Sequence, residues 1–399
     1  MAKLLYLVHR IPYPPNKGDK IRSFHFLKAL AKHYEIFLGT FIDDPLDKQY
    51  AGELQAYCAE TCCIDLSPLP SKIKSLRGFV SGEALSLPYY RNQQLQDWTD
   101  EVIDNHGIDR VLIFSSPMAQ YVEKYPDLYR IADFVDVDSD KWRQYADSKS
   151  WPASWVYHRE AKQLLGYEIE IAKQVNETFF VSEQEAQLFK TLAPEVANKI
   201  GFVNNGVDTV FFDPNLSFDN PYPQQQPILV FTGAMDYWAN VDAVCWFAQQ
   251  VLPIITTVLP QVRFYIVGSK PTKEVQLLAQ NDPAVIVTGR VDDVRQYLAH
   301  ALAVVAPLRI ARGIQNKVLE AMAMAKPVIA TSAAMEGISV VENLVVAIAD
   351  NEQVFADQVI SYITNAYIEA KSNRNFVESQ FGWQQNGQKL CDLLEKRDD

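Results

Sequence analysis

A run of cations beside a predicted helix start has the chemistry to bind a phosphorylated ligand. In the stretch APLRIARGIQNKVLEAMAMAKPVIATS, Arg309 and Arg312 precede Gly313, and the strong helix formers that follow predict a helix beginning at that glycine. Gly313, Lys317 and Glu320 then lie at i, i+4 and i+7 on one stripe. Cations and a helix N-terminus suit a diphosphate, and Glu320 suits sugar hydroxyls. The alternative is a surface pair between Lys317 and Glu320, worth about 0.2–0.5 kcal/mol.

Other predicted strand-to-helix junctions carry glycines. Gly18 follows a proline-rich loop, Gly233 and Gly268 end two strands, and Gly289 with Arg290 ends a third. A glycine lets backbone N–H groups approach an anion, although any tight turn also favours glycine. The dinucleotide fingerprint GxGxxG does not occur in the sequence. Asp292 and Asp293 suit the N-cap of the helix that follows.

The elements that position these residues alternate between short apolar strands and amphipathic helices. Strands such as KLLYLVH, EIFLGTFI and RVLIFSS are separated by helical stretches, and the alternation restarts after Pro227 with PILVFTGA. This pattern predicts α/β architecture, with two doubly wound Rossmann-like domains on parallel sheets. We predict domains at 1–206 and 228–375, a turn-rich linker at 207–227, and a helical tail at 376–399 that packs back on the first domain.

Composition excludes several classes of protein. The chain has 399 residues, 48% of them hydrophobic, with a net charge of -12. It is too apolar to be disordered and too acidic for non-specific nucleic-acid binding. Five cysteines with three at Cys58, Cys62 and Cys63 indicate neither a disulfide framework nor a zinc site. The short N-terminal apolar run and the interrupted segment 243–262 predict a cytoplasmic protein without a membrane-spanning helix.

At these residues the sequence resembles the retaining glycosyltransferases of family 4, which have the GT-B fold. The resemblance covers essentially the whole chain and includes NGVD at 205–208 and LEAMAMAKPVIAT. The phrases KGDKIRSF, FVDVDSDKWRQYA, FTGAMDYWANVDAVCWF and RIARGIQNKVLEAMAMAKPV resemble, more narrowly, the sugar transferases associated with exosortase and PEP-CTERM exopolysaccharide systems. The resemblance implies two domains that face each other across a cleft and a nucleotide-diphosphate sugar as co-substrate, with no other cofactor.

The resemblance also implies roles for individual residues. Glu320, the second acid of an E-x7-E motif, holds the donor ribose, and the backbone of Gly313 and Ile314 contacts the donor sugar or phosphate. The backbone near Arg290 and Val291 borders the nucleobase. The remaining donor-binding positions are glycines at strand ends or helix starts: Gly18, Gly233 and Gly268.

Two departures from the family pattern change the expected charges. Arg312 stands where the first acid of E-x7-E is expected, and the loop from Ala234 to Asn240 lacks the usual bases. We therefore expect Arg309, Arg312 and Lys317 to stabilise the leaving diphosphate as the catalytic cations, with Arg10 or Arg22 as a further source of charge.

The DVDSD run offers a different chemistry. Asp136 and Asp138 form a D-x-D pair, which holds Mg²⁺ or Mn²⁺ in glycosyltransferases of the GT-A fold. The second α/β half argues for the reading without a metal, in which Asp136, Asp138 and Arg22 bind the acceptor. Helix capping is the alternative role for Asp138 and Asp140.

The partners expected are a nucleotide sugar and a glycan or polyprenyl-linked acceptor. The first 32 residues carry seven bases against the single acid Asp19, and SKIKSLRGFV carries Lys72, Lys74 and Arg77. These bases suit peripheral contact with the inner face of an anionic membrane, and a solvated helix face is the alternative. A GT-B protein that binds a nucleotide sugar without transferring it is the alternative function.

Overall fold

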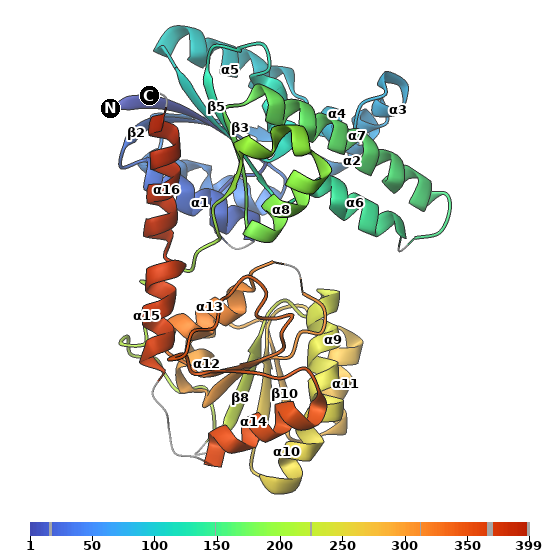
Figure 1. Ribbon diagram of the computed structural model, residues 1–399, viewed down its shortest axis with the longest axis vertical. Coiled ribbons are helices and arrows are strands. Elements are labelled where there is room, and N and C mark those ends of the chain that lie inside the picture. The colour runs from blue at the N-terminus through green and yellow to red at the C-terminus, as the bar shows by residue number, and fades with distance from the viewer. Residues whose placement is uncertain (16–17, 148, 224–225, 312, 365–369, 397–399) are drawn as a thin grey trace. The chain divides into compact units, whose positions relative to one another are not determined.

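The chain folds into two compact units, shown in the computed structural model of Figure 1. The first unit comprises Met1–Asn204 and Asn386–Asp399, and the second comprises Asn205–Gln385. The structure describes residues 1–15, 18–147, 149–223, 226–311, 313–364 and 370–396.

The first unit is built on a seven-stranded sheet in the order β3-β2-β1-β4-β5-β6-β7, with parallel pairing throughout. From β1 the chain first adds β2 and β3 on one side and then β4 to β7 on the other, so the strand order reverses beside β1. Ligands of open α/β sheets bind at such switch points. The strands are β1 Ala2–Val8, β2 Tyr34–Ile42, β3 Glu60–Asp65, β4 Arg110–Phe114, β5 Tyr129–Val135, β6 Glu177–Phe180 and β7 Ile200–Phe202.

Helices cover this sheet, and side-chain caps fix several of their starts. Asn92 caps α5 and Ser182 caps α8, each accepting a hydrogen bond from a backbone N–H three residues on. The helices are α1 Gly18–Leu30, η1 Pro45–Ala56, α2 Pro68–Ser75, α3 Gly78–Ser81, α4 Ser86–Tyr90, α5 Gln93–His106, η2 Ser116–Tyr121, α6 Asp138–Asp147, α7 Ala153–Gln174, α8 Glu183–Leu192 and η3 Pro194–Lys199.

The second unit repeats the plan with a six-stranded parallel sheet in the order β10-β9-β8-β11-β12-β13. Its strands are β8 Ile228–Thr232, β9 Arg263–Val267, β10 Val285–Gly289, β11 Ala303–Ala306, β12 Val328–Ala330 and β13 Val346–Ile348. Its helices are α9 Trp238–Trp246, η4 Phe247–Val251, α10 Leu252–Val258, α11 Lys273–Asn281, α12 Val294–His300, α13 Asn316–Ala323, α14 Glu352–Thr364 and α15 Lys371–Gln380. The prediction of two doubly wound α/β halves is confirmed.

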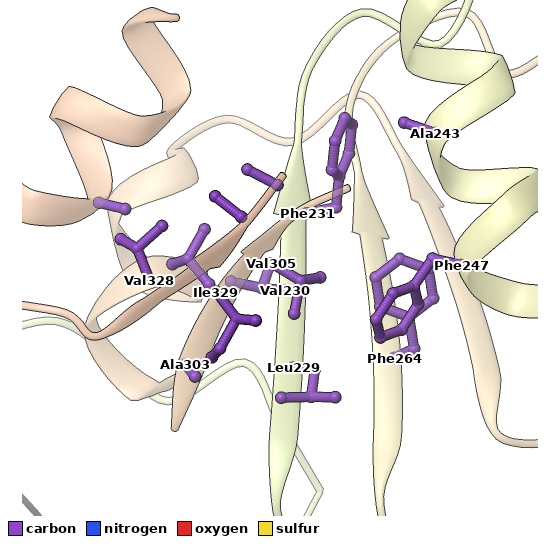
Figure 2. Packing of buried hydrophobic residues seen from close by; sticks show 14 of the residues in the cluster. Leu229, Val230, Phe231, Ala243, Phe247, Phe264, Ala303, Val305, Val328 and Ile329 are labelled. Carbon is purple, nitrogen blue, oxygen red and sulfur yellow. The ribbon is translucent and has the colours of Figure 1, made fainter. Parts of the chain in front are cut away.

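The core of the second unit forms where these strands meet α9 and the helical turns that continue it. Figure 2 shows Phe264 of β9 beside Phe247, with ring centroids 4.5 Å apart, and Phe231 on the neighbouring strand β8. All three side chains are fully buried. Continuous apolar strands are expected for a parallel sheet that is covered on both faces.

One helical stretch in the described part of the chain, Trp238–Val258, is apolar and long enough to span a membrane by length and composition. Half of it is buried inside the protein, and Phe247, Val251 and Ile255 belong to the core of the second unit. These contacts are those of a core helix.

The division between the units differs from the predicted boundaries. The turn-rich segment predicted as a linker is part of the second unit, where Arg374 donates to the carbonyl oxygens of Thr209 (3.1 Å) and Phe212 (2.7 Å). The predicted tail is divided, because α15 lies in the second unit whereas most of the last helix, α16 (Trp383–Glu395), is grouped with the first.

Contacts of α16 explain this grouping. Tyr129 donates its hydroxyl to the Leu393 carbonyl oxygen at 3.1 Å, and Arg110 donates to that of Leu394 at 3.3 Å. The helix α1 also approaches α16 so closely that a Cβ on Gly387 would lie 2.4 Å from the Ala29 Cβ. The C-terminal helix therefore completes the packing of the N-terminal sheet.

Candidate active site

Three strands of the second unit end in glycines that pack together at the carboxyl edge of the sheet. A Cβ on Gly268 would lie 1.6 Å from the Gly233 carbonyl oxygen. The Gly268 N–H in turn donates to the Gly289 carbonyl oxygen at 3.2 Å. Backbone packing alone therefore demands glycine at position 268, a requirement separate from the donor-binding role expected of it.

Gly233 is constrained by the side chain that it faces. A Cβ there would lie 2.7 Å from the Asn240 Nδ2 and 3.5 Å from the Lys317 Cε. Because Gly233 has no side chain, it leaves room for Lys317 to reach the loop after β8.

The helix that carries Lys317 begins at Asn316, three residues later than predicted. Gly313 has a φ of 66°, a left-handed conformation that a helix cannot contain, and the Gln315 side chain donates to its carbonyl oxygen at 2.9 Å. Gly313 therefore lies in the loop ahead of α13. Lys317 and Glu320 keep their places one turn apart on the helix.

Lys317 connects α13 to the start of α9. Its Nζ donates to the Asn240 Oδ1 at 2.8 Å, and the Asn240 Nδ2 donates to the Ala234 carbonyl oxygen at 2.8 Å. The ammonium also lies 5.1 Å from the centre of the Phe231 ring. An ammonium has three donors, and Asn240 is its one hydrogen-bond acceptor within the described residues. Two of its donors therefore have no acceptor among the described residues.

Burial changes the protonation of both site residues. It lowers the pKa of Lys317 to about 8, against the opposing effect of the Glu320 carboxylate. It raises the pKa of Glu320 to about 7, and Lys317 opposes that change. Both residues are half-buried, so the predicted stripe is not an exposed surface pair. Perturbed pairs of this kind concentrate at functional sites.

Arg309 contacts the same helix, α9, from a more exposed position. Its guanidinium forms a bidentate pair with Asp242, with Nε donating to Oδ2 at 3.0 Å, and lies 5.9 Å from the Trp246 ring centre. The pair offsets part of the positive charge expected here. Arg312, the third predicted catalytic cation, lies outside the described residues.

The residues expected near the nucleobase follow β10. Arg290 is exposed, while Val291 and Ile314 are partly buried and pack against the core of the unit. Asp293 accepts from the Arg295 N–H at 2.9 Å and caps α12, which confirms one of the two predicted caps. These three predicted donor-binding positions lie beside strand and helix ends of the second unit.

In the first unit, the predicted basic cluster is largely internal. Gly18 begins α1 and is exposed, and Lys17 lies outside the described residues. Lys20 is 1% exposed and pairs with Asp47 at 2.8 Å. The positive charge of Lys20, which was expected to attract an anionic ligand, is instead paired with Asp47 inside the fold.

Arg22, predicted to bind the acceptor, is internal in the first unit. Its side chain is fully buried, with Nε 2.7 Å from the Asp133 Oδ2 and Nη1 2.8 Å from the Val203 carbonyl oxygen. The guanidinium also packs 4.6 Å from the Phe26 ring centre. Arg22 joins α1 to the sheet, because a buried guanidinium requires such partners.

Arg10, the other cation considered for the diphosphate, is also paired. Its guanidinium lies 2.6 Å from the Asp19 carboxylate and 2.9 Å from that of Asp43. Burial raises the pKa of Asp19, but hydrogen bonding and charge from His9 and Arg10 outweigh it and hold the pKa well below its usual range.

Asp136 and Asp138 lie together after the carboxyl end of β5. Lys141 joins them, with Nζ 2.6 Å from the Asp136 Oδ2 and 3.1 Å from the Asp138 Oδ1. Both carboxylates are about one-third exposed. Lys141 thus forms ion pairs with the same two carboxylates that the D-x-D alternative assigns to a metal. Among the described residues, no three His, Cys, Asp or Glu side chains cluster to hold a metal.

Glu168 is a buried acid that sequence reasoning missed. It is fully buried on α7 and accepts from the Ser139 Oγ at 2.5 Å, while its Oε1 has no hydrogen-bond partner. Burial raises its pKa to about 8. The signal was a carboxylate between Leu164 and Ile171, at helical core spacing.

Backbone strain marks the same edge of the first sheet. Ser115 and Val135, which follow and end neighbouring strands, have φ values of 76° and 69°. Such values are rare for residues other than glycine, and more so for a β-branched one. Strained residues of this kind gather at functional sites.

Comparisons with known proteins agree with this architecture. Residues 226–365 match the family described as Glycosyl transferases group 1. Sucrose-phosphate synthase from Thermosynechococcus elongatus has a similar structure, with a TM-score of 0.69 and 17% identity over 99% of each chain. A glycosyltransferase from Rickettsia africae has a TM-score of 0.67 and 15% identity over 100% of each chain.

A third similar structure is Anabaena HepE in complex with UDP, with a TM-score of 0.64 and 14% identity over 99% of this chain and 100% of that one. No curated protein matches the chain in sequence. The chain therefore has the GT-B fold, and its second unit carries a region, residues 226–365, that matches the group 1 glycosyl transferases.

Proposed function

We propose that the protein is a retaining family 4 glycosyltransferase that moves a sugar from a nucleotide diphosphate to a glycan or lipid-linked acceptor. The observation that carries this proposal is Lys317, half-buried at the carboxyl edge of the second sheet with two ammonium donors available to a phosphate. HepE has been solved with UDP and with UDP-glucose, so a UDP-sugar is the first donor to test.

In this mechanism the protein stabilises charge that grows on the leaving diphosphate. Lys317, the backbone around Gly313 and Ile314, and Arg309 supply positive potential that is fixed before the reaction. Glu320 accepts hydrogen bonds from the ribose hydroxyls. Attack on the same face, assisted by the leaving phosphate, retains the configuration without a carboxylate nucleophile.

The reaction is metal-independent in this proposal. Asp136 and Asp138 share Lys141 and bind or orient acceptor hydroxyls. Turnover in excess EDTA at the untreated rate is the expected result. Loss of turnover that Mn²⁺ restores would contradict this part of the proposal and favour the D-x-D alternative.

Exopolysaccharide or cell-envelope glycan synthesis in the cytoplasm, as in exosortase-associated systems, is the proposed setting. This proposal is supported by the sequence phrases around Gly18, Asp136 and Lys317, which resemble those of the exosortase-associated sugar transferases.

A donor screen tests the proposed function. A nucleotide sugar present at about 100 times its Kd stabilises the folded protein by about 2.7 kcal/mol, which raises the melting temperature. The donor that binds should then be hydrolysed slowly by the purified protein. Binding without hydrolysis or transfer would support the alternative, a non-catalytic nucleotide-sugar-binding protein, which Arg312 in place of the usual acid favours.

A further inference from the structure

The first unit exposes a set of apolar side chains on α2, α3 and the start of α7. Leu69, Ile73 and Val80 are 75%, 69% and 93% exposed. The other exposed members of this set, which we term the apolar face, are Leu76, Phe79, Trp151 and Trp155. An isolated exposed leucine needs no explanation, but a contiguous apolar set marks an interaction site.

The aromatic members join α3 to the start of α7. The Phe79 and Trp155 rings stack with centroids 6.0 Å apart and an interplanar angle of 7°. These residues are 76 positions apart in sequence, so α3 lies against the start of α7, and α2 leads directly into α3 (Figure 1). Trp151 precedes Trp155 by four residues, in the turn that leads into α7.

The base of the apolar face is firmly held. Arg159 donates to the carbonyl oxygens of Gly78 and Glu83, and its guanidinium lies 4.9 Å from the Phe79 ring centre. Glu160 accepts from the backbone N–H groups of Leu85 and Ser86. The exposed side chains therefore project from an ordered support.

The charged side chains of α2, α3 and the turn between them have one sign. Residues 67–82 contain Lys72, Lys74 and Arg77, all exposed, and no acid. The chain as a whole has a net charge of -12. Bases beside protruding apolar and tryptophan side chains match the interface of a bilayer whose headgroups are anionic.

We propose that the apolar face and its three bases dock the protein on an anionic lipid bilayer. The side chains protrude instead of lining a groove, which suits insertion among lipid chains better than capture of a folded partner. Trp151 and Trp155 have the amphipathic rings that favour the headgroup level. If the proposed function holds, this docking brings the enzyme to lipid-linked acceptors.

Vesicle sedimentation tests the docking without donor or acceptor, so its outcome does not depend on glycosyl transfer. The full chain is mixed with phosphatidylcholine vesicles, with or without phosphatidylglycerol. Binding should require phosphatidylglycerol and weaken at high salt. Wild-type protein that stays in the supernatant with phosphatidylglycerol vesicles would overturn the proposal.

Two variants locate the contact. I73E/V80E should abolish vesicle binding, while the control L46E/V210E, which alters apolar residues of similar exposure elsewhere, should bind like wild type. K72Q/K74Q/R77Q should weaken binding about a hundredfold, since each base near an anionic surface contributes about fivefold. The matched control, K190Q/K273Q/K389Q, removes three bases outside both basic segments and should bind like wild type.

Two results would contradict the assignment. Wild-type vesicle binding by I73E/V80E would place the lipid contact elsewhere. Self-association without lipid that I73E/V80E abolishes would identify a second copy of the chain as the occupant. Donor hydrolysis by I73E/V80E should equal that of wild type, which separates loss of docking from loss of the active site.

Discussion

Lys317 and Glu320 carry opposite charges one helical turn apart in a partly buried setting. Burial disfavours the charged form of each, so the pKa of Lys317 falls to about 8 and that of Glu320 rises to about 7. The site is in its binding form when Glu320 has lost its proton and Lys317 has kept its own. That condition holds best between the two values.

Donor affinity should therefore be greatest near pH 7 to 8. Below this window Glu320 gains a proton and becomes a poorer acceptor for ribose hydroxyls, and above it Lys317 loses the charge that attracts the diphosphate. Each limb should approach about a tenfold loss of affinity per pH unit. Calorimetry with a UDP-sugar across pH 5.5–9.5, values chosen to bracket ~7 and ~8, measures both limbs.

The variant E320Q provides the control for this profile. It should bind the donor more weakly at pH 7.5, a value about midway in the window, and lose the acidic limb while keeping the basic one. An unchanged acidic limb in E320Q would show that another group controls it.

Arg22 differs from Lys317 because its partner, Asp133, is 111 residues away in sequence and both are fully buried. Arg22→Ala leaves Asp133 buried without its partner and should destabilise the protein by about 3–5 kcal/mol in urea unfolding. Lys28→Ala on the exposed side of α1 should change stability by less than about 0.5 kcal/mol. Unchanged stability with a raised KM for acceptor would support the acceptor-binding role.

At the level of single elements, the sequence was sufficient where a pattern is local and insufficient where a contact is distant. The stripe of Lys317 and Glu320 follows from helix periodicity, and their helix was predicted with its start three residues early. The early start arose because Gly313 takes a left-handed φ that composition does not reveal. The burial of Arg22 depends on a partner in another strand.

Gly268 illustrates a requirement set by neighbouring strands. Gly268→Ala would place a Cβ 1.6 Å from the Gly233 carbonyl oxygen, so the ends of β8 and β9 must separate. Overpacking of this kind costs about 1–3 kcal/mol or more, and urea unfolding measures it. Gly166→Ala, on a helix with open space at the Cβ, should be neutral or slightly stabilising. Equal stability of both variants would show that the strand ends yield freely.

At the scale of the whole molecule, alternating strands and helices predicted two doubly wound sheets, and both are present. The grouping of the segments differs from the predicted domain bounds at two places, because the turn-rich segment and α15 lie in the second unit, while α16 lies mostly in the first. Such groupings depend on contacts between Gly387 and Ala29, or between Arg374 and Phe212, which no local pattern contains. The net charge of -12 also hides local differences, because some bases, such as Arg22, are paired inside the fold while others, such as Lys72, are exposed.

The most direct test of the account is turnover by Lys317→Ala at saturating donor. Loss of one preorganised cation should lower kcat by about a hundredfold to a thousandfold, or about 2.7–4 kcal/mol. Lys273→Ala, an exposed position at the start of α11 in the same unit, should retain the wild-type rate. Turnover by Lys317→Ala at the wild-type rate, in a protein that remains folded, would contradict the central claim that this lysine stabilises the leaving diphosphate.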